Sequence, residues 1–180
     1  ALLLTASFVI TLFWSSGGFE QTQSTPVVAI AASVLFEQQC EEVKKDGRSK
    51  LHVTKFAVDD AMISNIGELE SIETLILDKG SVTGACMAAV ASLPKLQHLR
   101  LRLSPINDEG MKQLSNCKTL WYVNLPHAVC SAKGVAELAA IPKLRQLRLG
   151  SKGLGNEVTR EIASIESLRG VHLIGIAVTD

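Results

Sequence analysis

A fixed period of 24 residues is the feature that most constrains this chain. Aliphatic residues recur at that interval from Ile72 through Leu96, Leu120 and Leu144 to Leu168. A unit of this size cannot bury its apolar face alone, so successive units must stack and share a continuous core. The period therefore predicts a solenoid in which residues 24 positions apart lie side by side.

Each unit has two halves with different hydrophobic periods. The first half, as in LQHLRL, alternates apolar and variable residues and predicts a short strand with one buried face. The second half, as in GMKQLSNC, places apolar residues three or four apart and predicts an amphipathic helix of about two turns. Short polar residues that suit helix N-caps fill a column between the halves: Asp59, Thr83, Asn107 and Ser131, continued by Gly155 and Thr179.

The composition fits a core of small repeated layers. Hydrophobic residues make up 47% of the chain but aromatic residues only 4%, so aliphatic side chains must fill the interior. The four cysteines show no CxxC spacing, which argues against a zinc site or a disulfide framework. Cys86, Cys117 and Cys130 fall in columns otherwise filled by apolar residues or glycine, so we expect buried free thiols there.

The N-terminal part differs from the repeats. Residues 1–14 form an uncharged apolar run, so we expect 1–18 to be a secretory signal or membrane anchor, rather than a buried helix, and 19–25 to be a linker. Thr25 and Pro26 are typical of a helix start.

A helix over 26–47 would cover the open end of the first repeat. The apolar spacing suggests that it packs through one face, which Val28 and Leu35 widen and whose members are Val27, Ile30, Ala31, Val34 and Gln38. The leucine-rich repeats then occupy 48–180, as about five units and a truncated sixth.

The repeats resemble the leucine-rich repeat family. The segments INDEGMKQL and VTD match the 24-residue bacterial form LxxLxxLxLxxTxITDxGLxxL, which is abundant in planctomycete-like bacteria. The resemblance implies an α/β solenoid, a right-handed βα superhelix with parallel strands on the concave face, short helices on the convex face and ligand binding by concave residues. One column departs from that form, because Phe56, Gly80, Ser104, Ala128, Lys152 and Ile176 stand where Thr or Asn is usual.

One cluster on the expected concave face is both basic and partly aromatic. Alternating residues of one strand point the same way, and neighbouring strands lie about 4.8 Å apart. The candidate partner-binding residues are His98, Arg100, Arg102, Tyr122, Asn124, Gln146, Arg148 and His172. Arginine forks suit an acidic protein surface or an anionic glycan, whereas the alternative is a strand face that is merely solvated. We expect Trp121 to pack at the strand edge rather than to contact a partner.

The charge pattern excludes some partners. Basic and acidic residues both number 18, and the basic patch has no nucleic-acid-binding motif, so nucleic acid is not an expected partner. Charge is nevertheless segregated: residues 37–78 contain five basic and ten acidic residues, and residues 94–152 contain ten basic and three acidic.

Nothing in the sequence assembles a catalytic or metal site. The four histidines lie in different repeats, and His52 and His172, which share a column, stand five strands apart, roughly 24 Å. We therefore expect no cofactor, no metal and no enzyme activity.

These observations favour a non-catalytic protein-interaction module that acts outside the cytoplasm, secreted, periplasmic or membrane-anchored. Two alternatives remain. The chain could be the recognition part of a longer enzyme or signalling protein, or a structural envelope repeat without a specific ligand.

Overall fold

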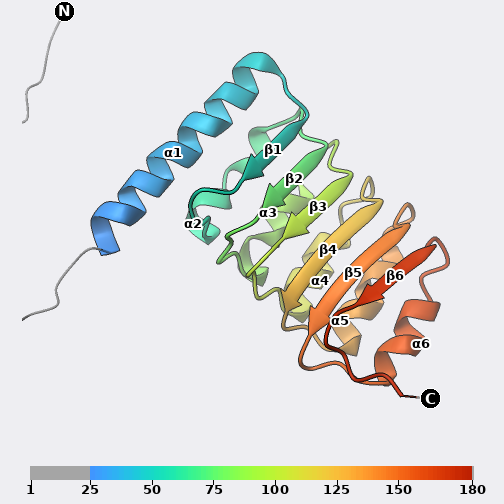
Figure 1. The fold of residues 1–180 in the computed structure, drawn as a ribbon. Coiled ribbons are helices and arrows are strands. Elements are labelled where there is room, and N and C mark those ends of the chain that lie inside the picture. Colours follow the sequence, from blue (N-terminus) through green and yellow to red (C-terminus); the bar gives the residue numbers. More distant parts are fainter. Residues whose placement is uncertain (1–24, 180) are drawn as a thin grey trace, which may run out of the picture.

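The chain forms a single parallel sheet with short helices on one side. The computed structural model describes residues 25–179, with side chains from residue 31 on, so the predicted signal or anchor and most of the linker lie outside the described residues. The strands are β1 (Lys50–Val53), β2 (Thr74–Leu77), β3 (His98–Leu101), β4 (Tyr122–Ala128), β5 (Gln146–Ser151) and β6 (Gly170–Leu173). They lie side by side in chain order (Figure 1).

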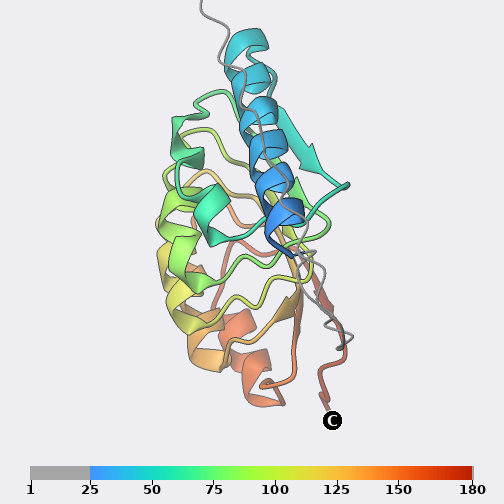
Figure 2. The same ribbon diagram turned by 90° about the vertical axis from the view of Figure 1, so that its left-hand side faces the viewer.

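The helical halves of the units are shorter than two regular turns in several repeats. The α-helices are α1 (Thr25–Asp46), α2 (Asp60–Ile63), α3 (Met87–Ala91), α4 (Asp108–Leu114), α5 (Ala132–Glu137) and α6 (Glu157–Ala163). Single 3₁₀ turns add to three of the repeats: η1 (Ile66–Glu68), η2 (Gly84–Cys86) and η3 (Leu138–Ala140). The side view shows the short helices of the repeats stacked along one side of the sheet, with α1 at the first end of the stack (Figure 2).

The strands pair in the register that the period predicts. All five pairings are parallel and join residues 24 apart, as Leu75 with Leu99 and Leu147 with Val171. The exception is the end of β4, where the register shifts after Leu125 and Ala128 pairs with Ser151. Inward side chains of successive strands therefore form layers, and Leu99, Leu101, Val123 and Leu125 are fully buried. This confirms the solenoid.

The predicted N-cap column is confirmed in four of its six positions. Each capping side chain accepts a hydrogen bond from a backbone N–H in the first turn of its helix; these residues are Asp59, Thr83, Asn107 and Ser131. Gly155 cannot do so, and there Asn156 precedes α6 while the Glu157 carboxylate accepts from the Gly155 N–H at 2.9 Å.

The three repeat cysteines are buried, as predicted, with Cys130 1% exposed and Cys117 2%. The described cysteines are all free thiols.

The face through which α1 packs differs from the prediction. Val34 and Leu35 are 45% and 46% exposed, whereas Phe36 and Val43 are buried in the core. The predicted face was wrong because its apolar run ends half-way along the helix. The stripe through Ala32, Phe36 and Val43 continues to the point where α1 meets the first repeat.

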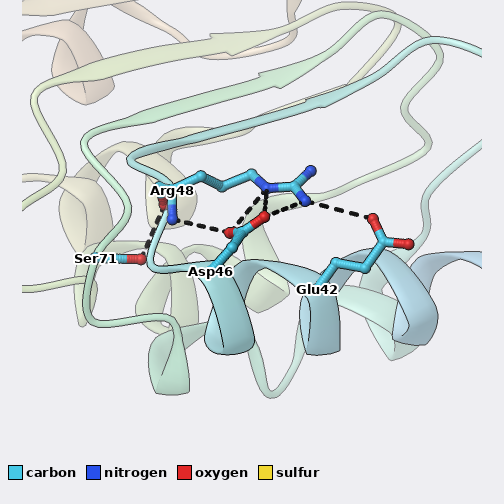
Figure 3. Close-up of polar contacts among 4 residues, drawn as sticks. All are labelled: Glu42, Asp46, Arg48 and Ser71. Atoms are coloured by element: carbon cyan, nitrogen blue, oxygen red, sulfur yellow. Dashed lines mark hydrogen bonds and ion pairs between the residues drawn. The ribbon is translucent and has the colours of Figure 1, made fainter.

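A polar cluster fixes the turn from α1 into the first repeat (Figure 3). Gly47 follows the helix with φ +66°, a left-handed conformation that favours glycine, and its N–H donates to Val43 O at 2.9 Å. Arg48 Nε donates to Asp46 Oδ2 at 2.8 Å, and Ser71 Oγ donates to Arg48 O at 2.9 Å. The capping helix and the first two repeats are thereby joined at one corner.

Polar clasps connect alternate pairs of repeats at the edge where helices begin. In each clasp, the side-chain carboxylate or amide at the start of one unit's helix accepts a hydrogen bond from the backbone N–H of the N-cap residue of the next unit. The same side chain forms a second hydrogen bond with the hydroxyl group of that N-cap residue. The pairs are Asp60 with Thr83, Asp108 with Ser131 and Asn156 with Thr179.

At the opposite edge, hydroxyls donate to main-chain carbonyls across the same junctions: Ser71 to Arg48, Thr119 to Leu96 and Ser167 to Leu144. The junction between the second and third repeats instead depends on close packing. A Cβ added to Gly110 would lie 2.6 Å from Gly84 Cα, so glycine is needed there.

Removing an inward leucine should destabilise the stack. Leu99→Ala opens a cavity between fully buried layers and should lower the free energy of unfolding by about 2 to 5 kcal/mol, and Val123→Ala by less. Chemical denaturation measures both, with the exposed Lys95→Ala as control. Full stability of Leu99→Ala would contradict the layer assignment.

Removing one clasp should also cost stability. Asp108→Ala removes two charge-assisted hydrogen bonds to Ser131, and we expect a loss of about 2 to 3 kcal/mol in the same measurement. Glu109→Ala is the matched control because Glu109 lies in the same helical turn but contacts only Gln113. Equal effects of the two substitutions would show that helix charge, rather than the clasp, is responsible.

Candidate functional site

The predicted site residues lie together on the sheet surface opposite the helices, here called the strand face. His98 and Arg100 belong to β3, Tyr122 and Asn124 to β4, Gln146 and Arg148 to β5, His172 to β6, and Arg102 directly follows β3. The pairing places Arg100, Asn124, Arg148 and His172 in one row, and His98, Tyr122 and Gln146 in the next. His172 stands three strands from β3, roughly 14 Å away.

The row of His98, Tyr122 and Gln146 begins with an aromatic stack. The His98 and Tyr122 rings lie 4.2 Å apart between centroids, and Trp121 meets both edge-on at 6.2 and 5.9 Å. Burial lowers the pKa of His98, and the nearby charges of Lys50 and Arg100 lower it further. His98 therefore contributes a neutral aromatic surface at neutral pH, rather than the cationic charge of a basic site.

The row of Arg100, Asn124, Arg148 and His172 is less basic than the sequence suggested, because Asp78 partly neutralises its Arg100 end. His52 Nε2 lies 2.8 Å from Asp78 Oδ2, Arg100 Nη2 lies 3.0 Å from Oδ1, and Arg102 Nη1 lies 4.0 Å from the same oxygen. The hydrogen bond with His52, together with the charges of Arg100 and Arg102, outweighs burial and lowers the pKa of Asp78. Residue-type reasoning overlooked this, although the 24-residue columns place Asp78 beside Arg102.

The centre of the strand face carries polar atoms without hydrogen-bond partners. Asn124 is 4% exposed, and its Nδ2 donates to the Tyr122 hydroxyl at 3.2 Å. Its Oδ1 is buried and receives no hydrogen bond, and on the neighbouring strand Arg100 Nε is buried and donates none. Asp78 Oδ1 has the ion-pair contact of Arg100 but no hydrogen bond.

Arg148 is the cation that remains available in this row. It is exposed, and among residues 31–179 no carboxylate pairs with it, whereas Arg100 and Arg102 both approach Asp78. The strand face therefore combines one available guanidinium, an aromatic stack and a buried pair of unmatched polar atoms.

The described part of the chain shows no group of three His, Cys, Asp or Glu side chains that could hold a metal ion. Burial raises the pKa of the Cys130 thiol to about 11, and burial also raises the pKa of Cys40 to about 11. Both thiols are thus protonated at neutral pH and unsuited to act as nucleophiles.

The sheet consists of six parallel strands in chain order, and a short helix or turn follows each strand. Residues 24 apart pair along it from the first strand to the last. This architecture defines a leucine-rich repeat solenoid. No family model and no curated protein matches the sequence. The fold is similar to an internalin (InlF) of Listeria monocytogenes, with a TM-score of 0.57 and 19% identity over 73% of this chain. The match spans 36% of the internalin's length.

Two other solved structures match this fold more loosely. One is the ectodomain of the plant receptor kinase GASSHO1/SCHENGEN3 of Arabidopsis thaliana, crystallised with CASPARIAN STRIP INTEGRITY FACTOR 2. It has a TM-score of 0.44 and 18% identity over 64% of this chain and 17% of its own. The other is internalin C2 of Listeria monocytogenes, with a TM-score of 0.35 and 15% identity over 87% of this chain and the whole of its own.

None of the described helices is both long and apolar enough to cross a membrane.

The Asp78 cluster should make stability depend on pH in the acidic range. Because its folded-state pKa is lowered, Asp78 stabilises the native state fully above its unfolded pKa of about 3.9 and loses that contribution as pH falls through the folded value. Wild type should therefore exceed Asp78→Asn in melting temperature at pH 7, and the gap should close as pH falls below about 4. A gap that stays constant down to pH 2 would exclude this linkage.

Proposed function

We propose that this chain is a non-catalytic protein-interaction module that binds its partner on the strand face of β2 to β5. The observation that supports this most is the buried, unpartnered Oδ1 of Asn124 beside the buried, unpartnered Nε of Arg100. A buried polar atom without a partner costs about 1 to 3 kcal/mol, so such atoms are few in native proteins.

Rotation of the Arg100 and Asn124 side chains would bring these two atoms to the surface, where a bound protein segment would supply the groups that they lack. Asn124 Oδ1 requires a donor and Arg100 Nε requires an acceptor, and every peptide group other than that of proline carries one of each. The stacked rings of His98 and Tyr122 add an apolar surface next to this pair, of the kind that anchors protein partners.

The charge of the strand face favours an acidic patch on that partner, with Arg148 as its main contact. An exposed guanidinium can hold a carboxylate in a bidentate pair. Arg100 and Arg102 would contribute less, because each already approaches Asp78.

We further propose that the repeats are of the 24-residue bacterial type and that the module acts outside the cytoplasm. The repeat signature in INDEGMKQL and VTD supports the first statement, and the apolar run of residues 1–14 supports the second. Under this proposal residues 26–47 cap the array and residues 48–180 form its binding surface.

The test is recovery of protein partners by the immobilised chain. A triple change of Arg100, Arg102 and Arg148 to Glu should reduce recovery by about tenfold or more, because both the available and the paired cations reverse sign. A matched triple change of Lys112, Lys133 and Arg160 to Glu alters net charge equally on the exposed helical side and should have little effect.

Melting temperature and circular dichroism must first show that both variants are folded. Unchanged recovery by the folded strand-face variant would contradict the proposed binding surface.

A further inference from the structure

A second polar surface lies at the edge of the sheet where the strands begin. An open groove of about 1490 Å³ crosses the last three repeats at the turns that lead from helix to strand. Its wall includes Trp121, Lys143, Arg145, Gln146, Ser167 and Arg169, and we call it the edge groove.

Main-chain hydrogen bonds hold the groove's central row in place. Trp121 N donates to Gln97 O at 3.0 Å, Arg145 N to Trp121 O at 2.9 Å, and Arg169 N to Arg145 O at 2.8 Å. These residues thus continue the sheet ladder one position before the strands, with neighbours about 4.8 Å apart. Trp121, Arg145 and Arg169 form a row with a fixed spacing, unlike cations scattered on flexible loops.

The groove wall carries three cations, Lys143, Arg145 and Arg169, and one carboxylate, Glu166, so its charge is positive on balance. Among residues 31–179 no ion pair joins a carboxylate to Lys143, Arg145 or Arg169. Arg169 Nη1 donates to the carbonyls of Glu166 and Leu168 at 2.8 Å, which fixes its guanidinium without neutralising it. Such a row favours an anionic ligand.

The same column has a different character in the earlier repeats. There it carries Ser49, Glu73 and Gln97, so the cationic row is confined to the last two units. Lys143 is flanked in its own column by Thr119 and Ser167. Both hydroxyl groups donate hydrogen bonds to main-chain carbonyls. Lys143 is exposed, and among residues 31–179 it makes no such hydrogen bond.

The exposed face of Trp121 limits the class of anion. Trp121 is 37% exposed beside the cationic row, and its indole makes edge-on contacts with the rings of His98 and Tyr122. Most of the remaining wall is hydroxyl, amide or charged; apart from Trp121 only Ala139 and Pro142 are apolar. A peptide would need apolar pockets for alternate side chains, which such a wall does not provide.

A sugar chain matches these features better. The C–H face of a sugar ring packs on an indole, sugar hydroxyls bond to amides and hydroxyls, and carboxylates or sulfates pair with guanidinium groups. Trp121 and Arg169 stand two strands apart, roughly 10 Å, which is about the length of a disaccharide.

We propose that the edge groove binds an acidic polysaccharide. One sugar ring stacks on Trp121, and the anionic groups that follow pair with Arg145, Lys143 and Arg169. This site adjoins the protein-binding strand face and shares Gln146 with it, but its cations are different residues, so the proposal does not depend on the strand-face site.

The test is calorimetric titration of the chain with four probes: a galacturonate hexasaccharide, a heparin-derived hexasaccharide, neutral maltohexaose and hexaglutamate. At least one acidic saccharide should bind, with an affinity that falls as salt is added, and it should bind at least about tenfold more tightly than maltohexaose and hexaglutamate.

The double variant Lys143→Glu and Arg145→Glu should weaken saccharide binding by about tenfold or more. Trp121→Ala should weaken it by about fivefold, whereas Trp121→Phe keeps an aromatic face and should lose less than about twofold. The matched double variant Lys112→Glu and Lys133→Glu, on exposed helical positions, should bind within about twofold of wild type.

Three results would overturn the proposal: no binding of either acidic saccharide, hexaglutamate binding as tightly as the saccharides, or equal losses in the groove variant and its matched control. A folded Trp121→Ala variant with unchanged affinity would also overturn it. The strand-face triple variant should still bind the saccharide, so the failure of one site can be distinguished from the failure of the other.

Discussion

The main-chain ladder between parallel strands is the constraint on which the rest of this structure depends. Its 24-residue register holds from β1 to β6 apart from a shift at the end of β4, so strand residues lie beside those 24 positions before and after them. A shift of one residue would turn the inward leucines toward solvent, which is why the aliphatic pattern and the ladder specify each other. The ladder also extends beyond the strands, through Trp121, Arg145 and Arg169, and so builds a surface at the sheet edge.

The junctions between repeats are held by two different physical means. Polar clasps such as that of Asp108 with Ser131 join the first repeat to the second, the third to the fourth and the fifth to the sixth. Between the second and third repeats, Gly84 and Gly110 allow close backbone approach instead. Because a repeat array is stabilised by nearest-neighbour interfaces, cohesion need not be uniform along the stack. The alternation is visible in the sequence as Asp60, Gly84, Asp108, Ala132 and Asn156.

Charge is divided between two surfaces with different chemistry. On the strand face, Asp78 draws Arg100 and Arg102 into a cluster with His52, which leaves Arg148 as the available cation of that row. At the sheet edge Glu166 lies in the same groove wall, but among residues 31–179 it forms no ion pair with Lys143, Arg145 or Arg169. A fixed anion such as Asp78 lowers the attraction of a surface for anionic ligands, but it also orients the guanidinium groups around it. The two surfaces therefore suit different ligands.

The sequence by itself determined the repeat, the strand register, the buried leucine layers and most of the helix caps. These follow from periodicity, since a constant interval decides which backbone positions become neighbours. It also placed the strand-face residues in their correct rows, as for Arg100, Asn124 and Arg148.

Only the tertiary structure decided which face of α1 packs, that Asp78 reaches the arginines and that Asn124 is buried with an unmatched oxygen. These depend on how side chains from different columns fill space and meet diagonally. The interval fixes neighbouring backbone positions but leaves those contacts open, because each side chain has several rotamers and the surrounding packing selects among them.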